Sequence, residues 1–153
     1  MGGPEWIMVY TPSDIVHVIL AEDNPDDSML FSLAADVSGI FMNVSLAENG
    51  DMLLEFLHHK MRPALIFLDL DLPKRTGKDC IKAIRSDREF DSIPIIIYSG
   101  TSNNDDVDEC FNCGANYFVV KPGNFEGIVR MFQKVFRIDF TAPRSRAKFL
   151  IAS

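Results

Sequence analysis

The sequence is poor in the features that define secreted and membrane proteins. Its 153 residues include only three cysteines, which cannot all pair, and a domain of this length buries enough core to fold without disulfides. No stretch approaches the roughly 18 uninterrupted apolar residues that a membrane span needs. Residues 1–11 lack the basic start, apolar run and cleavage site of a secretory signal. We therefore expect a cytoplasmic protein that makes no membrane contact.

Basic residues are scarce before residue 121. Residues 1–120 carry 20 acidic and 8 basic side chains, whereas residues 121–153 carry 2 acidic and 7 basic ones. The formal net charge of −7 argues against a nucleic-acid partner for the domain as a whole. The basic C-terminal end indicates either a solvated helix and tail or a local contact with an acidic partner.

Short apolar runs rich in β-branched residues alternate with segments of helical character. The runs are residues 16–20, 42–47, 64–68, 93–98 and 117–120, and the helical segments are residues 26–37, 50–59, 78–86, 104–113 and 125–137. This alternation predicts βαβ units, and hence a doubly wound α/β domain with five parallel strands and five helices. In the first helix, helical spacing predicts that one apolar stripe faces the sheet: Met29, Leu30, Leu33 and Val37.

The same pattern predicts the domain boundaries. We expect an N-terminal extension over residues 1–14, a single domain over residues 15–138 and a C-terminal tail over residues 139–153. The tail contains Pro143 and an apolar patch at residues 149–151.

Cys110 and Cys113 form a C-x-x-C pair at helical spacing. A redox site would place such a pair at a helix N-terminus, and a zinc site would need two further ligands. Because the pair lies at a helix end, we interpret both cysteines as small core residues.

Six polar side chains stand at the predicted carboxyl ends of four strands: Glu22 and Asp23, Asp69 and Asp71, Ser99, and Lys121. Ligands of doubly wound sheets bind outside these strand ends. Carboxylates crowded together repel one another, and a hard cation such as Mg²⁺ relieves the repulsion. With a hydroxyl and an ammonium opposite the cation, the pattern indicates Mg²⁺-dependent phosphoryl transfer onto or off an aspartate.

Four stretches carry a family resemblance: ILAEDNP at residues 19–25, IFLDLDLP at residues 66–73, Ser99-Gly100, and Gly114-Ala115 leading to VKP at residues 120–122. Residues 17–137 resemble the receiver domain of two-component response regulators, including the spacings of 30 residues from Asp69 to Ser99 and 22 from Ser99 to Lys121. The sequence around Asp69 is most similar to small stand-alone receivers paired with bacterial phytochrome kinases. The resemblance implies a flavodoxin-like fold with strand order 2-1-3-4-5.

The resemblance also implies the chemistry of the site. Asp69 would accept a phosphoryl group from a histidine of a sensor kinase or phosphotransfer protein, and Lys121 would pair with a phosphate oxygen. Mg²⁺ would be held by Asp69, by Asp23 directly, by Glu22 through water and by the backbone carbonyl of Asp71. An acidic Asp71 stands where relatives often have Asn or Met, which bears on the lifetime of the phosphoryl group.

A switch would report the phosphoryl group. By resemblance, Ser99 would swing toward the phosphate and Phe118 would rotate inward with it, which makes phosphorylation a local charge change that biases a bistable element. Phe118 replaces the commoner Tyr and so lacks the hydroxyl. The bond between Lys121 and Pro122 would be cis, as is usual in the family.

We expect a signalling domain and not an enzyme that turns over a substrate. The only reactions expected are the self-catalysed uptake and loss of the phosphoryl group. No DNA-binding module is visible after Arg137, so output would pass to an unidentified partner protein, or the chain is a fragment of a longer regulator. The output face would be formed by the fourth helix, the fifth strand and the fifth helix, with the change felt first by residues 103–113 and 125–137. Its opposed charges would either pair across a two-fold axis in a homodimer or form a solvated rim.

Two alternatives remain. LDLDL at residues 68–72 is also similar to the first motif of haloacid-dehalogenase-type phosphatases, in which Asp69 would be the nucleophile and Asp71 the acid/base. That family needs an acidic pair after the lysine, and its domain opens with this motif. This sequence has no such pair, and the motif does not open the domain. Turnover of a phosphate ester would distinguish a phosphatase from a receiver. A receiver-like fold used only for binding is disfavoured because every charged active-site position is filled.

Overall fold

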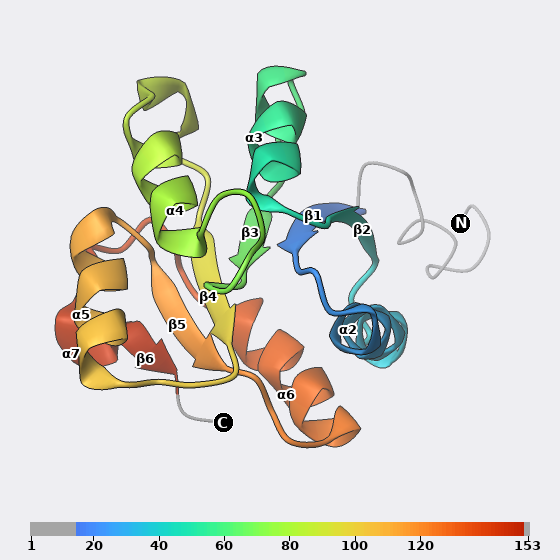
Figure 1. Cartoon of the computed structure of the whole chain (residues 1–153). Coiled ribbons are helices and arrows are strands. Elements are labelled where there is room, and N and C mark those ends of the chain that lie inside the picture. The colour runs from blue at the N-terminus through green and yellow to red at the C-terminus, as the bar shows by residue number, and fades with distance from the viewer. Residues whose placement is uncertain (1–14, 152–153) are drawn as a thin grey trace, which may run out of the picture.

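The computed structural model describes residues 15–151, which form a parallel sheet in the order β2-β1-β3-β4-β5-β6 (Figure 1). The strands are β1 (Val16–Ala21), β2 (Met42–Ala47), β3 (Leu65–Leu68), β4 (Ile95–Ser99), β5 (Tyr117–Val120) and β6 (Leu150–Ile151). The helices are α2 (Pro25–Val37), α3 (Gly50–His58), α4 (Gly77–Arg85), α5 (Asn104–Cys113), α6 (Phe125–Val135) and α7 (Arg146–Phe149), with one short 3₁₀ turn, η2 (Arg88–Phe90). The flavodoxin-like fold and the five predicted strands and helices are confirmed.

Helices cover both faces of the sheet (Figure 1). α2 and α6 pack on one face, and α3, α4 and α5 on the other. Successive side chains of a strand point to opposite faces of the sheet. Leu65 and Phe67 of β3 therefore lie in the core beneath α2 and α6, and Ile66 and Leu68 lie in the core beneath α3, α4 and α5. Burial on both faces is the reason that the central strands have apolar residues without alternation.

The predicted buried face of α2 is wrong. The four residues of the expected stripe (Met29, Leu30, Leu33 and Val37) are 41–60% exposed. The helix instead buries Phe31, Ala34 and Ala35. The Phe31 ring packs edge-on against Phe67 and Phe132 at centroid distances of 5.0 and 4.8 Å, and the two alanines let the helix lie close to the sheet.

All five predicted strands are present, and the segment expected to be a tail adds α7 and a sixth strand, β6, beside β5. Phe118 and Val119 of β5 pair with Leu150 and Ile151. Phe149 is fully buried, with its ring 5.3 Å from that of Phe111. A strand of two residues has no measurable period, so only its packing identifies it. The boundaries at residues 14 and 138 stay predictions, and the N-terminal extension lies outside the described residues.

Two arginines fasten this C-terminal segment to α5. The Arg144 guanidinium donates to the backbone oxygens of Phe111 and Ala115, both at 2.9 Å. Arg146 forms an ion pair of 2.7 Å with Asp108. The basic C-terminal end therefore pairs in part within the chain.

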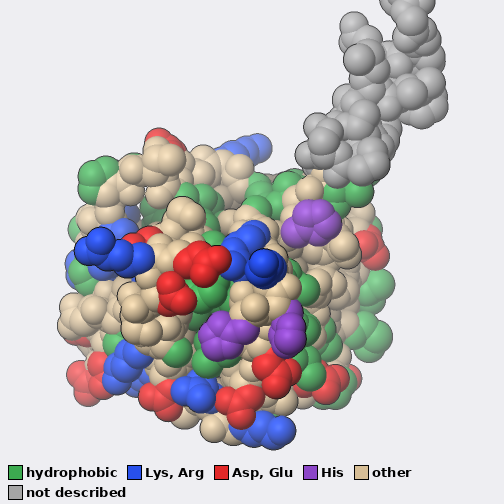
Figure 2. Space-filling view, turned by 90° about the horizontal axis from the view of Figure 1, so that it is seen from above, with side chains coloured by type: hydrophobic (Ala, Val, Ile, Leu, Met, Phe, Trp, Pro, Cys, Tyr) green, Lys and Arg blue, Asp and Glu red, His purple; other side chains and the backbone are tan. Residues whose placement is uncertain are grey.

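The two ends of the sheet differ in chemistry. Figure 2 looks onto the end where the strands begin, and acidic and basic side chains intermingle there around the histidines. The polar residues predicted at the strand carboxyl ends gather at the opposite end.

Among the described residues no peptide bond is cis, so the expectation for Lys121–Pro122 is wrong, and this bond has the trans form that most bonds before proline adopt in folded proteins. No helix of residues 15–151 is long and apolar enough to cross a membrane.

Two of the three cysteines lie in the core, and Cys113, which was also predicted to be a core residue, is partly exposed. Cys80 and Cys110 are buried, and burial raises their pKa values to about 11 and about 12. We expect iodoacetamide to modify the partly exposed Cys113 faster than either of them in the native protein. Peptide mass spectrometry after timed alkylation measures the order, and labelling of Cys110 ahead of Cys113 would contradict it.

Candidate functional site

Backbone hydrogen bonds fix two carboxylates side by side just past the ends of β1 and β3. The Glu22 N–H donates to the Ala47 oxygen at 2.9 Å, and the Asp69 N–H donates to the Ala21 oxygen at 3.0 Å. These bonds continue the sheet ladder one residue beyond each strand, so the positions are set by rigid backbone. Gly77 allows α4 to start against this edge, because a Cβ there would lie 2.5 Å from the Asp69 backbone oxygen.

Three carboxylates converge at this edge. Glu22, Asp23 and Asp69 each offer an oxygen within 4.8 Å of the others. Glu22 and Asp69 are buried, whereas Asp23 is exposed. The pKa of Glu22 rises to about 7, mainly because the side chain is buried; the contact with Lys121 works against this rise, and the nearby Asp69 adds to it. Such crowded, hard oxygen donors suit a divalent cation, and the three residues are placed to hold one.

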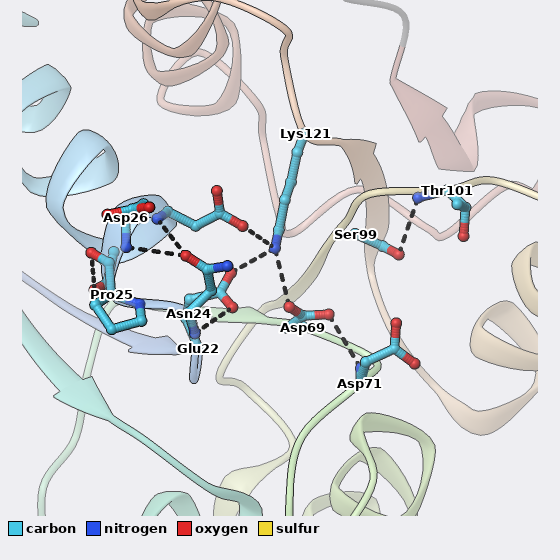
Figure 3. A network of polar contacts seen from close by, with 11 residues as sticks. Glu22, Asn24, Pro25, Asp26, Asp69, Asp71, Ser99, Thr101 and Lys121 are labelled. Carbon is cyan, nitrogen blue, oxygen red and sulfur yellow. Dashed lines mark hydrogen bonds and ion pairs between the residues drawn. The ribbon is translucent and has the colours of Figure 1, made fainter.

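Lys121 reaches this cluster from the end of β5 (Figure 3). Its Nζ lies 2.6 Å from Glu22 Oε1 and 3.0 Å from Asp69 Oδ2. It also stands 5.7 Å from the centre of the buried Tyr98 ring. Burial by itself would lower the pKa of Lys121, but its carboxylate partners outweigh that effect and raise the pKa above its ordinary value. The ammonium is therefore a fixed positive charge beside Asp69.

Of the other predicted residues, Ser99 and Asp71 lie beside the cluster and Phe118 lies in the hydrophobic core. The Ser99 hydroxyl is buried and accepts from the Thr101 N–H at 3.4 Å, so it turns away from Asp69 (Figure 3). Asp71 contributes its backbone N–H, which donates to Asp69 Oδ1 at 3.0 Å. Phe118 is fully buried, with its ring 6.3 Å from that of Phe149.

Asp27 also belongs to the site, although it is not among the residues predicted from the sequence. Its Oδ2 lies 2.8 Å from Lys121 Nζ, which makes it a third carboxylate on the ammonium. The available signal was its place in the first turn of the helix that follows the acidic pair. Asp26 shares that signal, so the pattern alone did not separate the two.

The chain resembles known proteins over most of its length. The family model of the response regulator receiver domain matches residues 18–133. Among curated proteins, response regulator Rcp1 of Synechocystis sp. is 27% identical over 124 residues, covering 77% of this chain and 84% of the relative. Nothing in these comparisons supports the haloacid-dehalogenase alternative.

Solved structures give the same result. The chain is similar to the phosphorylated cyanobacterial phytochrome response regulator RcpA, with a TM-score of 0.72 and 27% identity over 78% of this chain and 90% of that one. It is equally similar to the Mn²⁺-bound form of response regulator Rcp1, with a TM-score of 0.72 and 26% identity over 85% and 99% of the two chains. The chain belongs to the response regulator receiver domain family, the phosphoacceptor modules of two-component signalling.

Proposed function

We propose that Asp69 is the phosphoacceptor and takes its phosphoryl group from a phosphohistidine of a sensor kinase or phosphotransfer protein. A carboxylate oxygen of Asp69 forms the new P–O bond as the P–N bond to the histidine breaks. The observation that carries this proposal is the position of Asp69, buried at a strand end between an ammonium and two further carboxylates. Lys121, whose Nζ lies 3.0 Å from Asp69 Oδ2, orients the carboxylate and would pair with the transferred group.

The donor set favours Mg²⁺ as the metal. Glu22, Asp23 and Asp69 would hold it together with the backbone carbonyl of Asp71. When bound, the ion supplies positive charge that screens the carboxylates from an incoming phosphoryl group. The Mn²⁺-bound form of the relative Rcp1 supports a divalent metal in this role.

We further propose that the domain signals in the cytoplasm through a partner protein that reads the face formed by α5, β5 and α6, and that Ser99 and Phe118 carry the change to it. Three acidic side chains of α5 already pair within the chain. Asp106 and Glu109 lie 2.5 and 2.6 Å from Lys78, and Asp108 pairs with Arg146. These internal pairs favour a rim that is neutralised within one chain over a homodimer held by charge pairs across a two-fold axis.

Incubation with Mg²⁺ and acetyl phosphate tests the proposed function. We expect the intact mass to rise by one phosphoryl group, and the gain to vanish when a chelator removes the metal. An unchanged mass under both conditions would overturn the assignment. Steady release of phosphate from a stable ester substrate, without a protein adduct, would indicate a phosphatase instead.

Divalent metal is expected to stabilise the fold, because a cation between Glu22, Asp23 and Asp69 binds the native state alone. The gain is about 2.7 kcal/mol at a hundredfold excess of ion over Kd. Asp23→Ala should raise the metal-free melting temperature by removing repulsion and abolish the response to metal. Thermal melts with Mg²⁺ and with chelator measure both effects. Asp26→Ala is the control, and an undiminished response in the Asp23 variant would exclude this site.

A further inference from the structure

The Lys121 ammonium has one carboxylate partner for each of its three N–H donors. Glu22 and Asp69 come from the ends of β1 and β3, and Asp27 comes from α2. A phosphoryl oxygen that pairs with Lys121 therefore competes with these partners for its N–H donors.

The three partners differ in what their release costs. Asp69 carries the phosphoryl group and so stays beside Lys121, whereas the side chain of Glu22 is 1% exposed and would lose its partner in a nearly dry environment. The side chain of Asp27 is 37% exposed, and water can hydrate its carboxylate once the ammonium leaves. Asp27 is thus the partner that is released most easily.

The position of Asp27 is fixed by the helix cap. The Asn24 side chain accepts from the N–H groups of Asp26 and Asp27 at 2.9 and 3.1 Å, and Pro25 opens the helix. Both aspartates lie in the first turn of α2, where the helix dipole favours negative charge. Of the two, Asp27 is the one whose carboxylate pairs with Lys121 in the described structure.

We propose that Asp27 is a positioning residue that holds Lys121 in the unphosphorylated protein and competes with the phosphoryl group for it. The inference rests on the proposed function, in which Asp69 is phosphorylated and Lys121 pairs with the phosphate. A contact that exists in only one of two states stabilises that state. The ion pair between Asp27 and Lys121 therefore opposes the phosphorylated form. It also keeps the ammonium aligned before phosphoryl transfer.

Beryllofluoride, a phosphoryl mimic, tests this competition at saturating Mg²⁺. Asp27→Asn should bind the mimic roughly two- to fivefold more tightly than the parent protein, because the free energy of a partly exposed ion pair corresponds to a change in affinity of that size. Asp26→Asn is the matched control, because it removes the same charge from the same helix turn but leaves the Lys121 contact intact. Titration calorimetry measures the affinities, and thermal melts confirm that both variants are folded.

Two further results separate an ion pair from a structural effect. Asp27→Glu keeps the charge on a side chain that is one methylene longer, so its affinity should return to within twofold of the parent. The gain in Asp27→Asn should also shrink as salt rises, because the pair is partly exposed. Equal affinities for Asp26→Asn and Asp27→Asn, or weaker binding by Asp27→Asn, would overturn the inference. If the parent protein itself failed to bind beryllofluoride, the proposed function would be the part that fails.

Discussion

Asp69→Asn is expected to abolish phosphorylation by acetyl phosphate, with no mass gain at times when the parent protein is fully labelled. The substitution keeps the shape of a buried side chain but removes the charge and the nucleophilic oxygen. It also removes one of the three carboxylates that are placed to hold the metal. We therefore expect the rise in melting temperature with Mg²⁺ to weaken in parallel. Intact mass spectrometry and thermal melts on one preparation measure both effects.

Asp71→Asn is the matched control for this experiment. Asp71 contacts Asp69 through a backbone N–H, which the substitution preserves. The variant should accept one phosphoryl group, and any difference should lie in how long the group persists. Full labelling of the Asp69 variant, or loss of labelling in both variants, would show that the phosphoacceptor has been assigned to the wrong residue.

Phe149→Ala is expected to lower the free energy of unfolding by about 3–5 kcal/mol, as for other fully buried aromatic residues. The ring has no exposed surface and lies between Phe111 and Phe118. Its removal therefore leaves a cavity where the C-terminal segment packs against the main core. For a domain of this size the melting temperature should fall by about 6–20 °C. Urea denaturation gives the free energy directly from the shift in midpoint.

The neighbouring residue provides the control. Leu150 is 43% exposed, so Leu150→Ala should cost about 1 kcal/mol or less. Similar losses in both variants would mean that the C-terminal segment does not pack against the sheet in solution.

The strands and the strand ends could be predicted because their signal is local. Runs such as Ile95 to Tyr98 are apolar at every position, and the polar residue that ends each run then falls at one edge of a parallel sheet. Glu22, Asp69 and Lys121 were therefore correctly predicted to lie close together. Their distances could not be predicted, since they depend on the registers of β1, β3 and β5.

The errors arose where the deciding partner is distant in sequence. Helix α2 carries two stripes at helical spacing, and the one with the larger aliphatic residues was predicted to be buried. The stripe that is buried contains Phe31, which fits between the rings of Phe67 and Phe132. In the same way, Asp26 and Asp27 are both aspartates in the first turn of α2, and only the position of Lys121 distinguishes them.

The contact between Phe149 and Phe118 has a consequence for protein engineering. The family match ends at residue 133, yet a module cut there would leave the edge of β5 without β6 and the Phe118 ring without its cover. A bare strand edge beside exposed aromatic rings favours association between copies. Grafts of this receiver into other proteins should therefore carry the chain through Ile151, and a fusion partner attached beyond that residue would be anchored to the strand that holds Phe118.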